Sequence, residues 1–108
     1  EATRSYAGNL ERLIGDVRER LGSKELPVVV GQTGNMKNPA LHAAQRAGAK
    51  VAGQRGPTGF VETEAFLRRP EDSPNTTHGH HWFGHAESYL LIGEALGESM
   101  SELLPKSR

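Results

Sequence analysis

The first half of the chain has the apolar spacing of a helix, then of a strand, then of a second helix. A helix of about 16 residues ending at Gly22 is predicted by apolar positions one turn apart: Tyr6, Leu10, Leu13, Ile14, Val17 and Leu21. The β-branched run Leu26–Gly31 predicts a strand covered on both faces, as in a parallel sheet. Asn38 and Pro39 then predict the N-cap and first position of an alanine-rich helix that reaches about Ala47.

The second half predicts a short strand, a long connection and a final helix. The strand is Phe60–Thr63, and the connection runs from Glu64 to about Gly84. A further set of positions predicts one side of a helix of about 20 residues. These positions are Ala86, Tyr89, Leu90, Gly93, Leu96, Gly97, Met100, Leu103 and Leu104. Two of these are glycines, which lower helix propensity, so we expect them to allow a close approach to a sheet.

The order α-β-α-β-α predicts an α/β protein with a parallel sheet and helices on its faces. Two strands do not make a stable sheet of this kind. The chain also begins with Glu1 rather than Met. We therefore expect residues 1–108 to be part of a single domain. Its sheet would be completed by missing polypeptide of the same protein or by self-association.

Charge and composition exclude several partners and chemistries. The chain has 13 Lys and Arg against 13 Asp and Glu, so charge gives no reason to expect nucleic acid or an anionic membrane as a partner. No apolar run approaches the roughly 18 residues of a membrane-spanning helix. Because there is no cysteine, disulfides, thiolate metal ligands and a cysteine nucleophile are all excluded.

Four of the five histidines fall within residues 78–85, just before the final helix. Imidazole exchanges protons near neutral pH and also binds metals, so three interpretations are open. The loop is a solvated segment without function, a zinc or nickel site formed by His78, His81 and His85, or the source of a general base. The histidine spacing matches no closed zinc motif.

The last interpretation is supported by a resemblance. Three parts of the chain resemble the C-terminal portion of the sialate O-acetylesterase-like carbohydrate esterases. They are Glu62-Thr63 after a strand, Gly79-His80-His81-Trp82, and the helix running from His85 to Gly97. Leu26–Gly31 and Ala43-Ala44-Gln45 resemble upstream parts of this family in the same order. These enzymes belong to the SGNH hydrolase superfamily. The resemblance implies a flavodoxin-like three-layer sheet, an acetylated carbohydrate substrate, no cofactor, and a secreted or periplasmic location.

The resemblance also implies residue roles. His81 is the catalytic base, while the family's acid position three residues earlier holds His78. The orienting acid is therefore unassigned, with Asp72 and Glu71 as candidates.

Three further residues are candidate contacts for the sugar. Trp82 is expected either to stack on it or to pack as a lid, and Gln32 and Asn35 lie in a loop that either binds substrate or is a plain turn between strand and helix.

No serine has the sequence context of a nucleophile. We therefore expect the chain to supply the histidine of a serine-type esterase and to be a poor esterase by itself. The alternative function is a non-enzymatic carbohydrate-binding or assembly module derived from a truncated esterase.

Overall fold

The computed structural model describes residues 2–34, 37–77 and 79–106. Within these ranges the main elements are α1 (Ala2–Arg20), β1 (Val28–Gly31), α2 (Pro39–Gly53), β2 (Thr58–Val61) and α3 (Ala86–Leu103). The connection between β2 and α3 contains three short 3₁₀ segments: η1 (Glu64–Phe66), η2 (Pro70–Asp72) and η3 (Gly79–Gly84). The predicted α/β class and the α-β-α-β-α order are confirmed. None of the helices in these ranges is long and apolar enough to cross a membrane.

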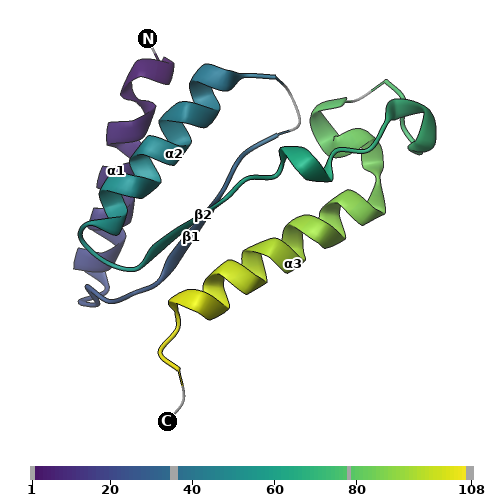
Figure 1. The fold of residues 1–108 in the computed structure, drawn as a ribbon. Helices are drawn as coiled ribbons and strands as arrows, with labels where there is room; N and C mark the ends of the chain where they lie inside the picture. Colours follow the sequence, from purple (N-terminus) through teal and green to yellow (C-terminus); the bar gives the residue numbers. More distant parts are fainter. Residues whose placement is uncertain (1, 35–36, 78, 107–108) are drawn as a thin grey trace.

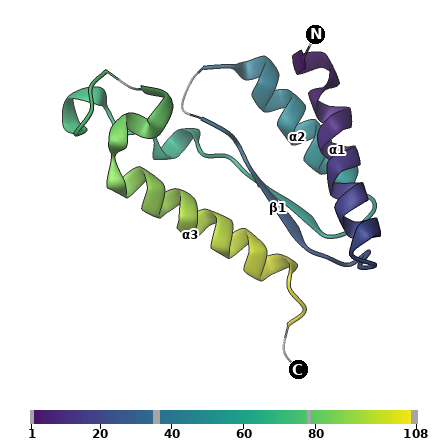
Figure 2. The same cartoon turned by 180° about the vertical axis from the view of Figure 1, so that it is seen from behind.

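The two strands pair in parallel, with Val28 opposite Thr58 and Gly31 opposite Val61. Figure 1 shows α1 and α2 together on one side of the strands and α3 on the other, and Figure 2 shows the same arrangement from behind. The described sheet is therefore a thin layer between two helical layers. Each strand has one neighbour in the described ranges, so both outer edges of the sheet are open.

The N-terminal helix ends as its sequence predicts. Gly22 has φ 62°, and the backbone N–H of Ser23 donates to the carbonyl of Arg18 at 2.9 Å. The apolar stripe of α1 is covered only in part: Ile14 is buried, whereas Leu13 and Leu21 are exposed. Because α1 packs along α2 rather than over the strands, the outer part of its stripe has no cover within the described ranges.

The second helix is longer than predicted. It begins as expected, with the Asn38 side chain accepting a hydrogen bond from the Leu41 N–H at 3.1 Å, but it continues to Gly53 instead of ending near Ala47. The reason is a helix crossing at Gly48. A Cβ atom at this residue would lie 2.8 Å from the carbonyl oxygen of Ala7, so glycine here permits contact with α1 rather than ending the helix.

The face that α3 turns to the sheet differs from the predicted one only in part, because Leu96 and Leu103 lie against the strands, 3.4 Å and 3.5 Å from Cβ atoms placed at Gly31 and Gly59. Tyr89 and Leu90 are exposed, and a Cβ atom at Gly93 or Gly97 would meet only open space, so those two glycines make no close approach. The close approach comes from the strand instead, because a Cβ on Gly59 would clash with the hydroxyl of Ser99. Ser99 on α3 and Gly59 on β2 are therefore the residues at which helix and sheet come closest together.

Candidate functional site

The candidate site is the long connection that leaves β2 at its carboxyl end and returns to the start of α3. Its described parts, residues 64–77 and 79–85, lie beyond the strand ends in Figure 1, the edge at which ligands collect in open α/β sheets. The strand was predicted at Phe60–Thr63, but β2 lies two residues earlier and spans Thr58–Val61. Thr63 therefore belongs to the beginning of this loop.

His81 lies on the surface of this loop, and its backbone is fixed from α3. His81 is exposed and has φ −109° and ψ 34°, outside helical geometry. The hydroxyl of Tyr89 donates to the backbone carbonyl of His81 at 2.8 Å. A general base must come within hydrogen-bonding reach of the hydroxyl that it deprotonates. The role of base stays a prediction.

The three residues after His81 all have left-handed backbone geometry. Trp82 has φ 54°, Phe83 has φ 51° and Gly84 has φ 67°. For a residue with a Cβ atom this geometry costs about 1–2 kcal/mol, so Trp82 and Phe83 store strain directly beside the candidate base. The turn is held by backbone hydrogen bonds from Asn75 N–H to the Phe83 carbonyl and from His85 N–H to the Trp82 carbonyl, both 3.0 Å.

The Trp82 side chain is only 7% exposed. A ring buried to this extent presents little of its face to a sugar, which favours packing beneath the loop over stacking. Its contact with substrate stays a prediction.

The two candidate acids are both bound to one arginine. Asp72 Oδ2 lies 2.7 Å from Nη2 of Arg69 and accepts a hydrogen bond from its Nε at 2.8 Å, and Glu71 Oε1 lies 3.3 Å from Nη1. The hydrogen bond and charge of Asp72, followed by the charge of Glu71, raise the pKa of Arg69. Because these carboxylates are engaged by Arg69, neither is singled out as the group that orients His81, and the orienting acid stays unassigned.

The described residues contain no group of three His, Cys, Asp or Glu side chains that could hold a metal ion. The alternative metal site requires His81 and His85 on one helical face, but α3 begins only at Ala86. His78, its third member, lies outside the described residues. His85 stands at the N-cap without a capping side-chain hydrogen bond, as expected from its residue type, and its Nδ1 atom is buried without a partner.

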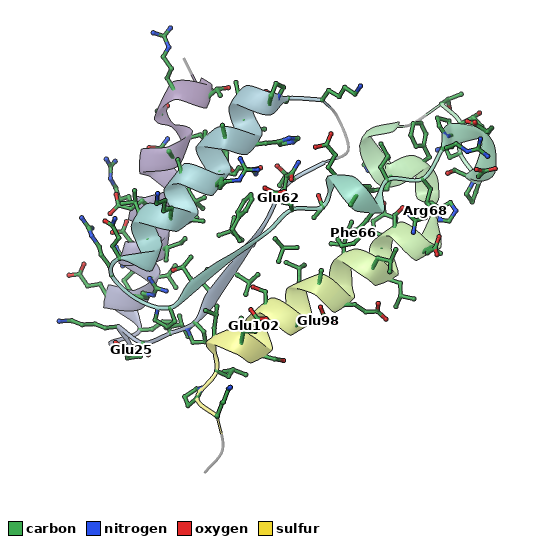
Figure 3. All side chains as sticks on the ribbon, viewed as in Figure 1. Glu25, Glu62, Phe66, Arg68, Glu98 and Glu102 are labelled. Carbon is green, nitrogen blue, oxygen red and sulfur yellow. The ribbon has the colours of Figure 1, made fainter. Side chains whose placement is uncertain are left out.

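The base of the loop is fastened to α3 by two polar contacts. The hydroxyl of Ser88, a fully buried residue, donates to the Phe66 carbonyl at 2.7 Å, and Arg68 Nε binds Glu87 Oε2 at 2.7 Å. Figure 3 shows Phe66 and Arg68 beside the first turns of α3. The loop is thus attached to the helix at its beginning, through Phe66 and Arg68, and close to its end, through His81.

The Arg68–Glu87 contact predicts an acid-dependent loss of stability. The hydrogen bond and then the charge of Arg68, with a smaller effect of His85, lower the pKa of Glu87 below its ordinary 4.5. A folded-state pKa below the unfolded one gives stabilisation that is complete above about pH 4.5 and is lost as pH falls through the folded value. Glu87→Gln should therefore lower Tm slightly at pH 7, with the difference shrinking as pH falls below about 4.5.

The control for this measurement is Glu94→Gln, which changes an exposed residue of the same helix. At pH 7 its Tm should lie closer to that of the parent protein than the Tm of Glu87→Gln does. Identical melting curves for Glu87→Gln and the parent protein at pH 7 would contradict a stabilising role of the contact.

Gln32 follows β1, and its side chain is used inside the protein. Its Nε2 lies 2.8 Å from Nδ1 of His42, and its Oε1 accepts a hydrogen bond from the N–H of Thr63 at 3.4 Å. The Thr63 hydroxyl donates to the backbone carbonyl of Gln32 at 2.9 Å. These contacts tie the two strand ends and α2 together. Substrate binding by Gln32 stays a prediction, and Asn35 lies outside the described residues.

Gln45, which was not among the predicted site residues, is a second buried amide at this edge. It is 1% exposed. Its Nε2 donates to the Thr33 hydroxyl at 2.6 Å and to the Tyr6 hydroxyl at 3.3 Å, and its Oε1 accepts from Thr33 N–H at 3.2 Å. His42 Nε2 lies 3.3 Å from the Thr33 carbonyl. The start of the loop after β1 is therefore held from α1 and α2.

The sequence did contain a signal for Gln45. It shares a helical face with Leu41, Gly48 and Ala52, which are spaced three and four residues apart. A polar residue inside an apolar stripe indicates a buried hydrogen-bonding group, because burial without partners is costly. No comparable signal marks Ser88, which lies among polar residues at the start of its helix.

Comparison with known proteins supports the resemblance noted in the sequence. The family model described as carbohydrate esterase, sialic acid-specific acetylesterase, matches residues 1–100. A search of curated proteins and a search of solved structures returned no match. The family match covers most of the chain, from α1 through most of α3. The chain therefore belongs to the sialic acid-specific acetylesterase family of SGNH-type carbohydrate esterases.

Proposed function

We propose that the chain is the C-terminal part of a serine-type carbohydrate O-acetylesterase and supplies its general base, His81. The observation that carries the proposal is the family match over residues 1–100, which includes the histidine loop. Two features of the loop support it: His81 is exposed, and its segment η3 belongs to the connection that leaves β2 at its carboxyl end. The nucleophilic serine and the oxyanion donors would come from polypeptide outside these residues.

The proposed reaction is acyl transfer in two steps. His81 accepts the proton of the serine hydroxyl as the serine oxygen attacks the acetyl carbonyl, and a tetrahedral intermediate forms. The bond to the sugar oxygen then breaks, and the imidazolium returns its proton to that oxygen. In the second step His81 takes a proton from water as the water oxygen attacks the acetyl-serine ester. The bond to the serine oxygen then breaks, the imidazolium returns its proton to that oxygen, and acetic acid leaves and ionises to acetate. The sugar hydroxyl and acetate are the products.

The same proposal explains the unfinished sheet. Two parallel strands covered by helices on both faces leave two open edges and an uncovered stripe on α1. A larger flavodoxin-like sheet would cover both, with strands supplied by the remainder of the protein or, in its absence, by a second copy of the chain.

The function is tested by incubating the full-length protein with O-acetylated sialic acid and, separately, with an acetylated neutral sugar, and measuring released acetate. We expect catalytic release from at least one substrate, with loss of activity and covalent labelling of one serine after treatment with a fluorophosphonate. Stoichiometric sugar binding without acetate release would contradict the esterase proposal and favour the carbohydrate-binding module.

A further inference from the structure

The turn that follows His81 has to be held in place. Trp82 and Phe83 both occupy a backbone region that favours glycine, and Gly84 continues it. Such geometry persists only where surrounding contacts impose it, and in proteins it is concentrated at functional sites. The contacts around this turn therefore determine where the preceding residue, His81, presents its side chain.

One of these contacts comes from a side chain on a regular helix. Tyr89 belongs to α3, three residues after its first position, and its hydroxyl donates to the carbonyl oxygen of His81 at 2.8 Å. That carbonyl belongs to the peptide linking His81 to Trp82, which is the peptide at which the chain enters the left-handed turn. A hydrogen bond at this point fixes the orientation of the peptide and hence the direction of the His81 side chain.

Because Tyr89 is exposed, the effect of its hydrogen bond can be distinguished from the effect of packing its ring. The residue is 51% exposed, and it lies on the part of α3 that does not face the sheet. An aromatic ring in this position contributes little to the core, so the hydroxyl is the part of the side chain with a specific partner. Removing it leaves the ring and the helix unchanged.

We propose that Tyr89 is a positioning residue, whose hydroxyl holds the carbonyl of His81, maintains the left-handed turn Trp82–Gly84 and thereby places the imidazole for proton transfer. The proton-transfer part of this inference rests on the proposed esterase function. Proton transfer requires the base within hydrogen-bonding distance of its partner, and a displacement of about 1 Å lowers rates by up to about a hundredfold.

The test compares Tyr89→Phe with Ser101→Ala in the full-length protein. Ser101 is a matched control because its hydroxyl also donates to a backbone carbonyl, that of Gly97 at 2.9 Å, at an exposed position of the same helix. Amide hydrogen exchange of residues 81–85 is measured first. Exchange should be about tenfold faster in Tyr89→Phe and unchanged in Ser101→Ala. Unchanged exchange in Tyr89→Phe would overturn the proposed contact, whether or not the protein is an esterase.

Acetate release is measured on the same proteins. Tyr89→Phe should lower kcat about tenfold with KM within about twofold of the parent value, because the base is displaced while substrate contacts remain. Faster exchange with unchanged kcat would overturn the positioning role. If the parent protein releases no acetate, the esterase function fails, whereas the exchange result still decides whether Tyr89 holds the turn.

A second variant tests the strain itself. Asn tolerates left-handed geometry better than Phe does, so Phe83→Asn should lower the strain of the turn. In the double variant Tyr89→Phe/Phe83→Asn, exchange of residues 81–85 should be slower than in Tyr89→Phe alone. Equal or faster exchange in the double variant would contradict the claim that the hydroxyl acts against backbone strain.

Discussion

Replacing His81 with Ala in the full-length protein should lower kcat for acetyl-ester hydrolysis by about a thousandfold or more. The expected size follows from serine hydrolases in general, in which the nucleophile and base act as one unit and the loss of either removes most of the rate enhancement. Since His81 is exposed, the substitution should leave Tm nearly unchanged. Added imidazole should restore part of the activity because it can occupy the vacated surface position.

The matched control is His85→Asn, which alters another histidine, at the end of the same loop. Asn is a preferred N-cap, whereas His85 makes no capping hydrogen bond and leaves a buried nitrogen without a partner. This variant should keep its activity and gain about 1 kcal/mol in stability. Near-normal turnover of His81→Ala would refute the assignment of the base, and loss of activity in His85→Asn alone would transfer the role to His85.

The sequence was sufficient for the order and class of the elements because their apolar periods are strong and their ends carry caps. Gly22 and Asn38 both act as predicted, one in a left-handed helix stop and the other as a capping side chain. These signals are local, since each depends on the backbone conformation of a few neighbouring residues. Tertiary packing does not have to be known to recognise them.

The errors occur where two distant segments meet. The second helix was expected to end near Ala47, but it continues through Gly48, which lies at the crossing with α1. Gly93 and Gly97 were expected to approach the sheet, whereas Gly59 on β2 makes that approach. A glycine has the same local propensity whether it ends a helix or admits a neighbour. Only the three-dimensional arrangement distinguishes the two cases.

The histidines located the candidate site in the sequence, but the residues that hold its loop in place were not predicted. His81 and Trp82 could be predicted as candidate residues from their residue types alone. Tyr89, Ser88 and Gln45 act through hydrogen bonds to backbone or side chains that are far away in sequence, so their roles depend on the fold. The left-handed geometry of Trp82 and Phe83 is equally invisible in the sequence, because neither residue type favours it.

The largest effect on stability is expected from Arg18→Ala, at the opposite end of the sheet from the histidines. Arg18 is 5% exposed, and its guanidinium donates to oxygen atoms of three separate segments. The acceptors are the carbonyls of Leu26 at 3.0 Å, Ala52 at 3.3 Å and Pro57 at 2.6 Å, and the hydroxyl of Thr58 at 3.0 Å. One side chain thus connects α1 to the end of α2 and to the segments that enter both strands.

The sequence next to the strand is adapted to this guanidinium. A Cβ atom at Gly56 would lie 2.9 Å from Cζ of Arg18 and 2.6 Å from the carbonyl oxygen of Lys24, so any larger residue would displace one of them. The partners of the buried cation are carbonyl dipoles and a hydroxyl. Removing the cation therefore leaves several buried acceptors without donors, which is more costly than losing an exposed charge.

Arg18→Ala should accordingly lower the free energy of unfolding by about 3–5 kcal/mol, which is enough to unfold a marginally stable domain. Arg18→Lys should recover only part of this loss, because an ammonium group cannot reach acceptors on three sides. The control Arg20→Ala, an exposed residue in the same last turn, should change stability by less than about 0.5 kcal/mol. Urea unfolding of the full-length protein measures all three. Equal midpoints for Arg18→Ala and Arg20→Ala would show that the buried guanidinium is not what holds the helices to the strands.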